Sequence, residues 1–342
     1  MTLAMNPAML EALRLTRSGS LTEATDMLQR ALAGVQAQPP RADGDVIDLV
    51  AKRIAPEARA AAGGFHQRSY RGPEGRLDYR LYVPADAAPD MPLVVMLHGC
   101  TQSPEDFARG TAMNRLADEH GFIVAYPGQT QAANAQKCWN WFRAQDQKRG
   151  GGEPALIAAV TRAVIADQRC DAARVYVAGL SAGGAAAAIM GVAYPDIFAA
   201  IGVHSGLACG SAVDMPGAFA AMRGNGRASA ANDGFVPVIT FHGDRDGTVA
   251  ESNAGAIADA ALRAGGPLKT RSITGDSGGR RYTTNVATGP DGRSMVERWT
   301  VHGAGHAWSG GDAGGSYADA SGPDASREMV RFFLQHRLHA TA

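Results

Sequence analysis

The sequence predicts an α/β domain with a mostly parallel central sheet flanked by helices. Short apolar runs of strand length alternate with longer helical patterns, which is typical of parallel strands joined by helical crossovers. The helical patterns cover residues 155–167 and 185–193. The expected strands cover residues 77–83, 93–97, 122–126, 174–179, 198–203, 236–242 and 295–301. Several of them lead directly into polar, glycine-containing loops, and such loops gather at the edge where parallel strands end.

Length and charge limit what the chain can do. Its 342 residues are enough for one α/β domain of about 250 residues and an extension. The 33 basic and 33 acidic residues give no net charge, so nothing indicates an electrostatic attraction for nucleic acid or an anionic membrane. We expect residues 66–342 to form the main domain. Within it, residues 275–293 are rich in Gly, Thr, Ser and Asp and predict a hairpin that forms a surface insertion.

Ser181 lies at the centre of Gly179-Leu180-Ser181-Ala182-Gly183, directly after the apolar run 174–179. A G-x-S-x-G sequence between a strand and a helix predicts a sharp turn, because small flanking residues allow the backbones to approach closely. Such a turn presents the serine hydroxyl to a cleft. The sequence therefore predicts Ser181 as a nucleophile.

A serine hydroxyl is a poor nucleophile at neutral pH. It needs an imidazole to accept its proton and a carboxylate to orient that imidazole. In proteins that use this turn, the chain order is Ser, Asp or Glu, then His. Asp246 follows the strand 236–242, and His306 follows the strand 295–301, so the order and the positions both fit.

Each of these two roles has a second candidate. Asp246 is preferred to Asp244 because the loop resembles the pattern H-G-x-x-D-x-x-V, in which the second acid is the catalytic one; Asp244 then caps nearby amides. His306 is preferred to His302 because His306 lies in a glycine-flanked loop. His302 directly continues its strand and fits a wall or surface position.

The oxyanion formed by attack on a carbonyl needs hydrogen-bond donors. One donor in this architecture is the amide after the nucleophile, here that of Ala182. The other comes from the loop after an earlier strand, here His98-Gly99-Cys100-Thr101-Gln102 after residues 93–97. We expect the Cys100 amide to be this second donor, with Thr101 as the alternative.

Four segments together resemble the poly(3-hydroxybutyrate) depolymerase family of esterases, which is related to feruloyl and acetylxylan esterases. These segments are Leu97-His98-Gly99-Cys100-Thr101-Gln102, Cys138-Trp139-Asn140-Trp141-Phe142, residues 174–184 and Gly303-Ala304-Gly305-His306-Ala307-Trp308. The resemblance implies an α/β-hydrolase fold and a serine esterase that needs no metal or cofactor. It implies short-chain polyhydroxyalkanoate (polyhydroxybutyrate) or its oligomers as substrate, with feruloyl or acetyl sugar esters as the alternative.

The cysteines and tryptophans of these motifs have two interpretations each. Similar esterases are bridged near Cys100 and Cys138, so a disulfide there is one interpretation and free thiols are the other. Aromatic rings with a polar N–H suit a polyester or a phenolic acyl group. Trp308, Trp139 and Trp141 are therefore our candidate substrate contacts, with packing in the core as the alternative. The cysteine spacings match no zinc pattern.

The first 65 residues differ from the rest. Helical spacing on both sides of Gly19 and the capping-box spacing of Ser20 and Glu23 predict a helical hairpin over residues 1–35. Residues 36–65 read as a linker. The helices pack on the main domain in one interpretation. In the other they dock on a second subunit or a polyester granule, which makes a granule-associated binding protein the alternative from another functional class.

The start of the sequence also bears on the compartment. Charged Glu11, Arg14 and Arg17 interrupt its apolar positions, whereas a secretory signal has a continuous apolar stretch. No segment is long and apolar enough to span a bilayer. We therefore expect a cytoplasmic protein whose partner is its ester substrate. The sequence gives no oligomeric state.

Overall fold

A computed structural model describes residues 63–226 and 235–338 of the chain. The predicted helical hairpin over residues 1–35, and the linker as far as residue 62, lie outside the described residues. The first strand that the structure describes begins at Gly64.

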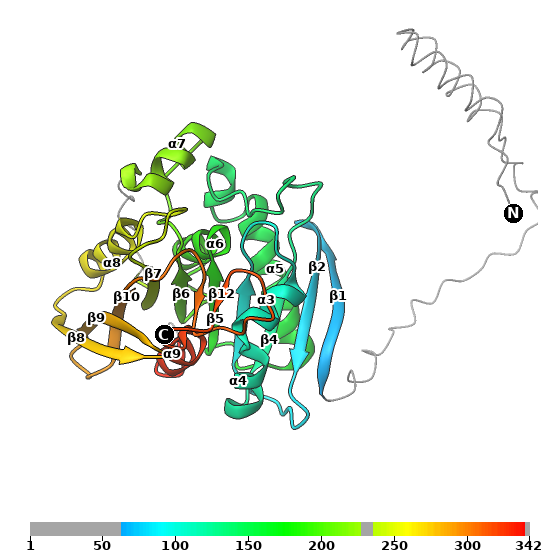
Figure 1. Ribbon diagram of the computed structural model, residues 1–342. Coiled ribbons are helices and arrows are strands. Elements are labelled where there is room, and N and C mark those ends of the chain that lie inside the picture. Colours follow the sequence, from blue (N-terminus) through cyan, green and yellow to red (C-terminus); the bar gives the residue numbers. More distant parts are fainter. Residues whose placement is uncertain (1–62, 227–234, 339–342) are drawn as a thin grey trace, which may run out of the picture. The chain divides into compact units, whose positions relative to one another are not determined.

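Within the described residues, ten strands form one sheet, with β1 and β2 at one edge and β8 and β9 at the other (Figure 1). The six neighbouring strands β4, β3, β5, β6, β7 and β10 are parallel, and the strands outside them pair in antiparallel fashion. In spatial order the strands are β1 (Gly64–Gly72), β2 (Gly75–Val83), β4 (Ile123–Pro127), β3 (Leu93–Leu97), β5 (Val175–Leu180), β6 (Ala200–His204), β7 (Val238–Gly243), β10 (Ser294–Val301), β9 (Arg280–Thr288) and β8 (Lys269–Ser277).

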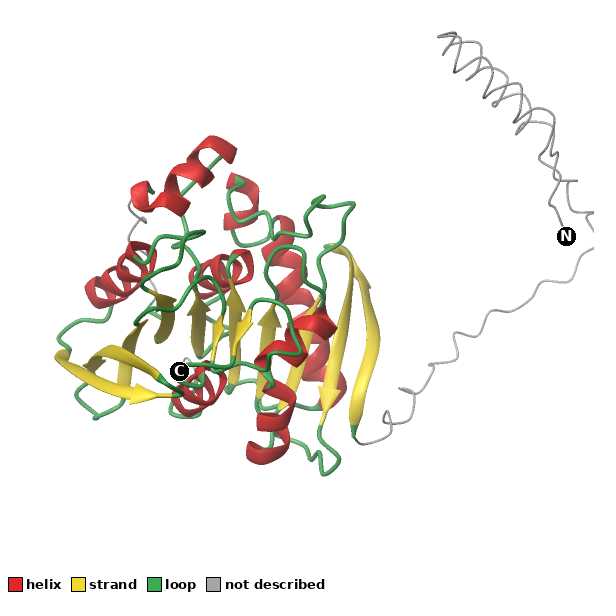
Figure 2. Ribbon diagram, viewed as in Figure 1, coloured by secondary structure: helices red, strands yellow, loops and turns green. Residues whose placement is uncertain are grey.

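Helices cover both faces of this sheet (Figure 2). Side chains of α5, α6 and α8 build the core on one face, and side chains of α3, α4 and α9 build it on the other. The helices are α3 (Pro104–Thr111), α4 (Met113–His120), α5 (Gly152–Gln168), α6 (Ala182–Ala193), α7 (Met215–Ala220), α8 (Ser252–Ala264) and α9 (Ala325–Phe333). Because both faces are covered, β3 to β7 are buried along their whole length, which explains why they read as continuous apolar runs.

The structure adds strands at the two edges of the predicted sheet. β1 was not predicted from the sequence, because this edge strand is at most half-buried along its length and carries no run of apolar residues. The predicted hairpin near residues 275–293 exists as β8 and β9, but it is not a separate surface insertion. β9 pairs with β10 and so extends the sheet.

Candidate active site

Ser181 occupies the turn between β5 and α6 with a backbone φ of 57°, and a positive φ is unfavourable for a residue with a side chain. A Cβ atom on Gly183 would lie 2.0 Å from the Leu97 carbonyl oxygen, and one on Gly179 would lie 2.3 Å from the Gly183 backbone. Both flanking positions therefore require glycine. The close packing of the backbone at Gly179 and Gly183 holds Ser181 in this strained turn.

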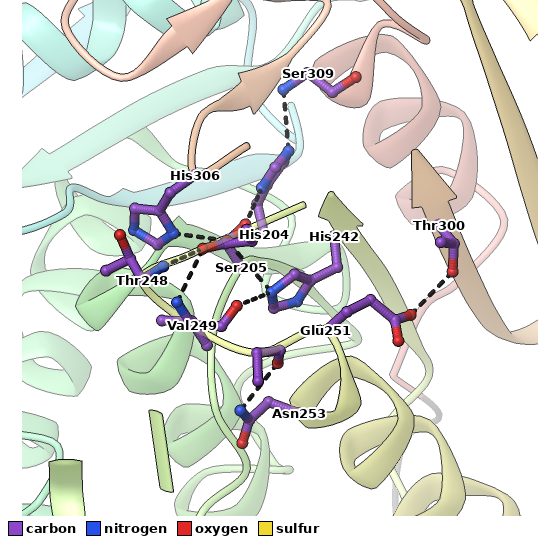
Figure 3. A network of polar contacts seen from close by, with 12 residues as sticks. His204, Ser205, His242, Thr248, Val249, Glu251, Asn253, Thr300, His306 and Ser309 are labelled. Atoms are coloured by element: carbon purple, nitrogen blue, oxygen red, sulfur yellow. Dashed lines mark hydrogen bonds and ion pairs between the residues drawn. The ribbon is translucent and has the colours of Figure 1, made fainter. Parts of the chain in front are cut away.

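Asp246 and His306, predicted from separate loops, meet in the structure. The distance from His306 Nδ1 to Asp246 Oδ2 is 2.7 Å, and the Asp246 side chain is completely buried. The other oxygen, Oδ1, accepts the amides of Thr248 and Val249, both at 2.9 Å (Figure 3). These two amides fix the carboxylate, and the carboxylate in turn fixes the imidazole ring.

His204 at the end of β6 connects Ser181 to the His306 loop. The Ser181 amide donates to the His204 carbonyl at 2.9 Å. The His204 ring accepts the amide of Ser309 through Nε2 at 3.0 Å, three residues after His306. Burial lowers the pKa of His204 to about 3, so the ring stays neutral and can accept this hydrogen bond.

A second buried histidine, His242 at the end of β7, also faces Asp246. Its Nε2 lies 3.3 Å from Asp246 Oδ2 and 2.8 Å from the Val249 carbonyl oxygen (Figure 3). Burial acts to raise the pKa of Asp246, but the hydrogen bonds from His242 and His306 hold it well below its usual range. The carboxylate is therefore ionised at neutral pH. His306 then carries its proton on Nδ1, which leaves Nε2 free to accept one.

The alternative residues Asp244 and His302 form a second, separate pair. Asp244 Oδ2 lies 2.8 Å from His302 Nδ1, and its Oδ1 accepts the Gly303 amide at 2.6 Å. His302 Nε2 lies 2.9 Å from Thr283 Oγ1 on β9. The structure thus places Asp244 as a cap of a local amide, and it places His302 on the wall formed by the sheet.

The loop of residues 98–102, here called the oxyanion loop, packs against the Ser181 turn. A Cβ on Gly99 would lie 3.6 Å from the Ser181 Cβ. The Gly99 amide donates to Gln102 Oε1 at 2.9 Å, and the Thr101 amide donates to the Gln136 carbonyl at 2.6 Å. Thr101, the alternative donor, is therefore already engaged. Within the described residues no acceptor takes the amide protons of Cys100 or Ala182.

Two features of the oxyanion loop were left open or missed by sequence reasoning. Cys100 and Cys138 form a disulfide, while Cys170 and Cys209 are free. His98 is completely buried; its Nε2 accepts the Gln129 amide at 3.0 Å and its Nδ1 lies 2.8 Å from the Gly99 carbonyl. Burial lowers the pKa of His98 to about 4. The ring is therefore neutral at pH 7, and its two hydrogen-bond contacts hold the oxyanion loop in place.

The three tryptophans that we considered as substrate contacts are buried. Trp139 and Trp308 are each 1% exposed, and Trp141 is 7% exposed. The Trp139 indole N–H donates to the His98 carbonyl, and that of Trp308 donates to Ser326 Oγ. The indole N–H groups of Trp139 and Trp308 therefore have hydrogen-bond acceptors inside the protein. The burial of the three rings supports the alternative interpretation, packing in the core.

Tyr317 is an aromatic residue beside the site that sequence reasoning missed. It is 47% exposed, and its ring lies edge-on to the His306 ring with centroids 6.4 Å apart. No periodic pattern marks a tyrosine in an irregular loop. Its closeness in the sequence to the His306 motif is the one signal that could have found it.

Neither metal ligation nor membrane insertion has support in the described part of the chain. Between residues 63 and 338, apart from the gap at 227–234, no group of three or more His, Cys, Asp or Glu side chains is placed to hold a metal ion. In the same ranges no helix combines the length and the apolar character that crossing a membrane requires.

Comparisons with known proteins point to esterases. A family model described as Esterase PHB depolymerase matches residues 77–283. The chain is 32% identical over 245 residues, 68% of its length, to poly(3-hydroxyalkanoate) depolymerase C of Paucimonas lemoignei, of which it spans 58%. It is 37% identical over 128 residues, 37% of its length, to feruloyl esterase B of Neurospora crassa, of which it spans 43%. The solved acetyl xylan esterase from Aspergillus awamori matches with a TM-score of 0.61 and 20% identity, over 79% of this chain and 99% of that one. This likeness shows the α/β-hydrolase fold.

Proposed function

Because the chain belongs to the esterase family of the poly(3-hydroxybutyrate) depolymerases, we propose that it is a carboxylic ester hydrolase that works through an acyl-enzyme. The observation that carries this proposal is the hydrogen bond between His306 and the buried, ionised Asp246. It lies at the same sheet edge as the strained Ser181 turn. Together they supply a nucleophile, a base and a group that orients the base.

In the proposed first half-reaction, Ser181 Oγ attacks the ester carbonyl carbon while His306 Nε2 accepts the hydroxyl proton. The tetrahedral oxyanion accepts hydrogen bonds from the free amides of Cys100 and Ala182. As the carbonyl re-forms, the C–O bond to the alcohol breaks, and His306 gives its proton to the departing oxygen. The products of this half-reaction are the alcohol and an ester of Ser181.

In the second half-reaction, water replaces the alcohol. His306 Nε2 takes one proton of the water as its oxygen attacks the acyl carbon. The second tetrahedral oxyanion collapses, and the proton returns to Ser181 Oγ. The acid leaves, and the enzyme is restored without any cofactor.

We propose short-chain polyhydroxyalkanoate, or its soluble oligomers, as the substrate. Support comes from the relative named a poly(3-hydroxyalkanoate) depolymerase, which matches 68% of the chain, against 37% for the feruloyl esterase. The chain spans little more than half of that depolymerase, so activity on the polymer itself needs a direct test.

The test compares amorphous polyhydroxybutyrate, hydroxybutyrate oligomers, methyl ferulate and acetylated xylan, each with wild type and Ser181→Ala. Release of hydroxybutyrate by the wild type and its loss in the variant is the expected result. Hydrolysis of methyl ferulate or acetylated xylan alone would overturn the polyester substrate. An undiminished rate in Ser181→Ala would overturn the mechanism.

A further inference from the structure

Residues 129–140, here called the clamp segment, lead away from the oxyanion loop and return to it. Both ends of this segment meet the same carboxylate. Glu153, in the first turn of α5, accepts the Gln129 side-chain amide through Oε1 at 2.5 Å. It also accepts the Asn140 side-chain amide through Oε1 at 2.5 Å and the Asn140 backbone amide through Oε2 at 2.6 Å. The Glu153 side chain thus links the two ends of the clamp segment.

The clamp segment in turn holds the oxyanion loop. Its attachments fall on both sides of Cys100, whose amide has no acceptor among the described residues and is our expected second oxyanion donor. They are the disulfide Cys100–Cys138, the hydrogen bond from the Thr101 amide to the Gln136 carbonyl at 2.6 Å, that from the Gln129 amide to His98 Nε2 at 3.0 Å, and that from the Trp139 indole to the His98 carbonyl at 3.1 Å.

We propose that Glu153 is a positioning residue of the oxyanion hole: its carboxylate fixes the two ends of the clamp segment, and the clamp segment fixes the direction of the Cys100 amide. Glu153 does not touch the substrate. The inference rests on the proposed acyl transfer at Ser181, because an oxyanion hole has a function only in that chemistry.

The chemistry of the contacts requires an ionised carboxylate. Three N–H donors converge on the two Glu153 oxygens, and a carboxylate is the side-chain group that can accept all three without presenting a hydrogen of its own. A glutamine would turn an NH2 group toward one of the donors. Burial raises the pKa of Glu153 to about 7; the hydrogen bonds from Asn140 and Gln129 oppose this rise, and nearby Asp146 adds to it. Above this pH the carboxylate form predominates.

Catalysis is sensitive to small displacements of such donors. Removing one oxyanion-hole donor costs about 100- to 1000-fold in kcat, and a misplaced donor loses part of this. Loosening the clamp segment leaves the Cys100 amide present but misdirected. We therefore expect Glu153→Gln to lower kcat by about 10- to 100-fold while KM changes by no more than about twofold.

The experiment measures three quantities at pH 8.5, where Glu153 is ionised: kcat, KM for p-nitrophenyl butyrate, and the inhibition constant of an alkyl trifluoromethyl ketone. This ketone forms a tetrahedral oxyanion with a catalytic serine, so its affinity reports the oxyanion hole directly. In Glu153→Gln we expect the affinity for the ketone to fall by the same factor as kcat. A general loss of packing would not produce that match.

Glu297→Gln is the matched control. Glu297 on β10 is 2% exposed and accepts hydrogen bonds from the Trp299 indole at 3.0 Å and from Arg331 at 2.6 Å, away from the oxyanion loop. We expect this variant to melt at a lower temperature, with kcat and ketone affinity within about twofold of wild type. Equal losses of kcat in both glutamine variants would overturn the proposal.

Gln129→Met is a milder variant for the case that Glu153→Gln does not fold. It removes one of the three donors to Glu153 and leaves the backbone contact to His98 in place. We expect kcat and the affinity for the ketone to fall together, by a smaller factor than in Glu153→Gln, and unchanged values would overturn the proposal.

If Ser181→Ala is inactive and Glu153→Gln is fully active, the positioning role of Glu153 is wrong, but the proposed function still stands. If the wild type hydrolyses no ester, the proposed function fails.

Discussion

Asp246 accepts hydrogen bonds from four groups, and only one of them, His306, was expected from the sequence. The order of Ser181, Asp246 and His306 along the chain and their places after strands were enough to predict that pair. The amides of Thr248 and Val249 and the His242 ring were not predicted. His242 and Val249 are positions of the pattern H-G-x-x-D-x-x-V, but that pattern served only to choose Asp246; the contacts themselves depend on the turn by which the chain folds back on itself after β7.

His242→Leu tests whether this second histidine supports Asp246. Hydrogen bonds that depress the pKa of Asp246 stabilise the fold above the usual carboxyl pKa of about 4, and this contribution is lost as the pH falls toward the depressed value. We expect the variant to be destabilised at pH 7, to be less destabilised at pH 3, and to lose about tenfold in kcat. Urea unfolding at both pH values and kcat at pH 8 measure this.

His336→Leu is the control for the general effect of replacing a buried histidine by leucine. His336 is 4% exposed, and burial lowers its pKa to about 4, but it lies after α9 and has no part in the proposed chemistry. We expect its kcat to stay within about twofold of wild type. Equal losses of kcat in both variants would contradict a specific role for His242.

The close contacts of the glycines beside Ser181 predict how substitutions there change the stability of the protein. A methyl group on Gly183 would meet the Leu97 carbonyl oxygen at 2.0 Å, whereas one on Gly247 would meet no atom within 4 Å. We expect Gly183→Ala to lose at least about 3 kcal/mol of unfolding free energy and Gly247→Ala to stay within about 0.5 kcal/mol. Urea denaturation followed by circular dichroism compares them. Similar stabilities of the two variants would contradict the close approach of β3 to the turn.

The central strands of the sheet and the hairpin of β8 and β9 could be predicted from the sequence, but the edge strand β1, the pairing of β9 with β10 and the clamp segment could not. β3 to β7 are buried on both faces, so their apolar character is independent of neighbouring elements. β1 and β8 are polar, and pairing with a neighbour defines them as strands. The clamp segment is an irregular loop held by Glu153 and a disulfide, and from the sequence its Trp139 was only a candidate substrate contact or a core residue.

Removing the disulfide tests whether the clamp segment stabilises the protein and supports catalysis. Cys100 and Cys138 are 38 residues apart, and closing a loop of this size stabilises a fold by about 2–4 kcal/mol. We expect the double variant Cys100→Ala/Cys138→Ala to lose stability in this range and to lose more in kcat than in KM. The control Cys170→Ala/Cys209→Ala removes the two free thiols and should keep its kcat. A control that loses as much kcat would contradict the role of the bridge.

At the scale of the whole molecule, family and fold are established and substrate and compartment are proposals. The chain spans 58% of the depolymerase that it resembles over most of its own length, so the substrate of that protein carries over only as a proposal. A disulfide beside the active site is typical of oxidising compartments, whereas we expected a cytoplasmic protein. Fractionation of the producing cells, with trapping of free thiols in each fraction, decides between them.

The central claim is that Ser181 is the nucleophile of an acyl-enzyme, and covalent trapping tests it most directly. The folded wild-type protein is treated with a serine-reactive fluorophosphonate, digested and analysed by mass spectrometry, beside Ser181→Ala and His306→Ala. We predict one adduct, on Ser181, absent from the first variant and formed much more slowly in the second. No adduct on folded wild-type protein, or an adduct on another serine that persists in Ser181→Ala, would contradict the account.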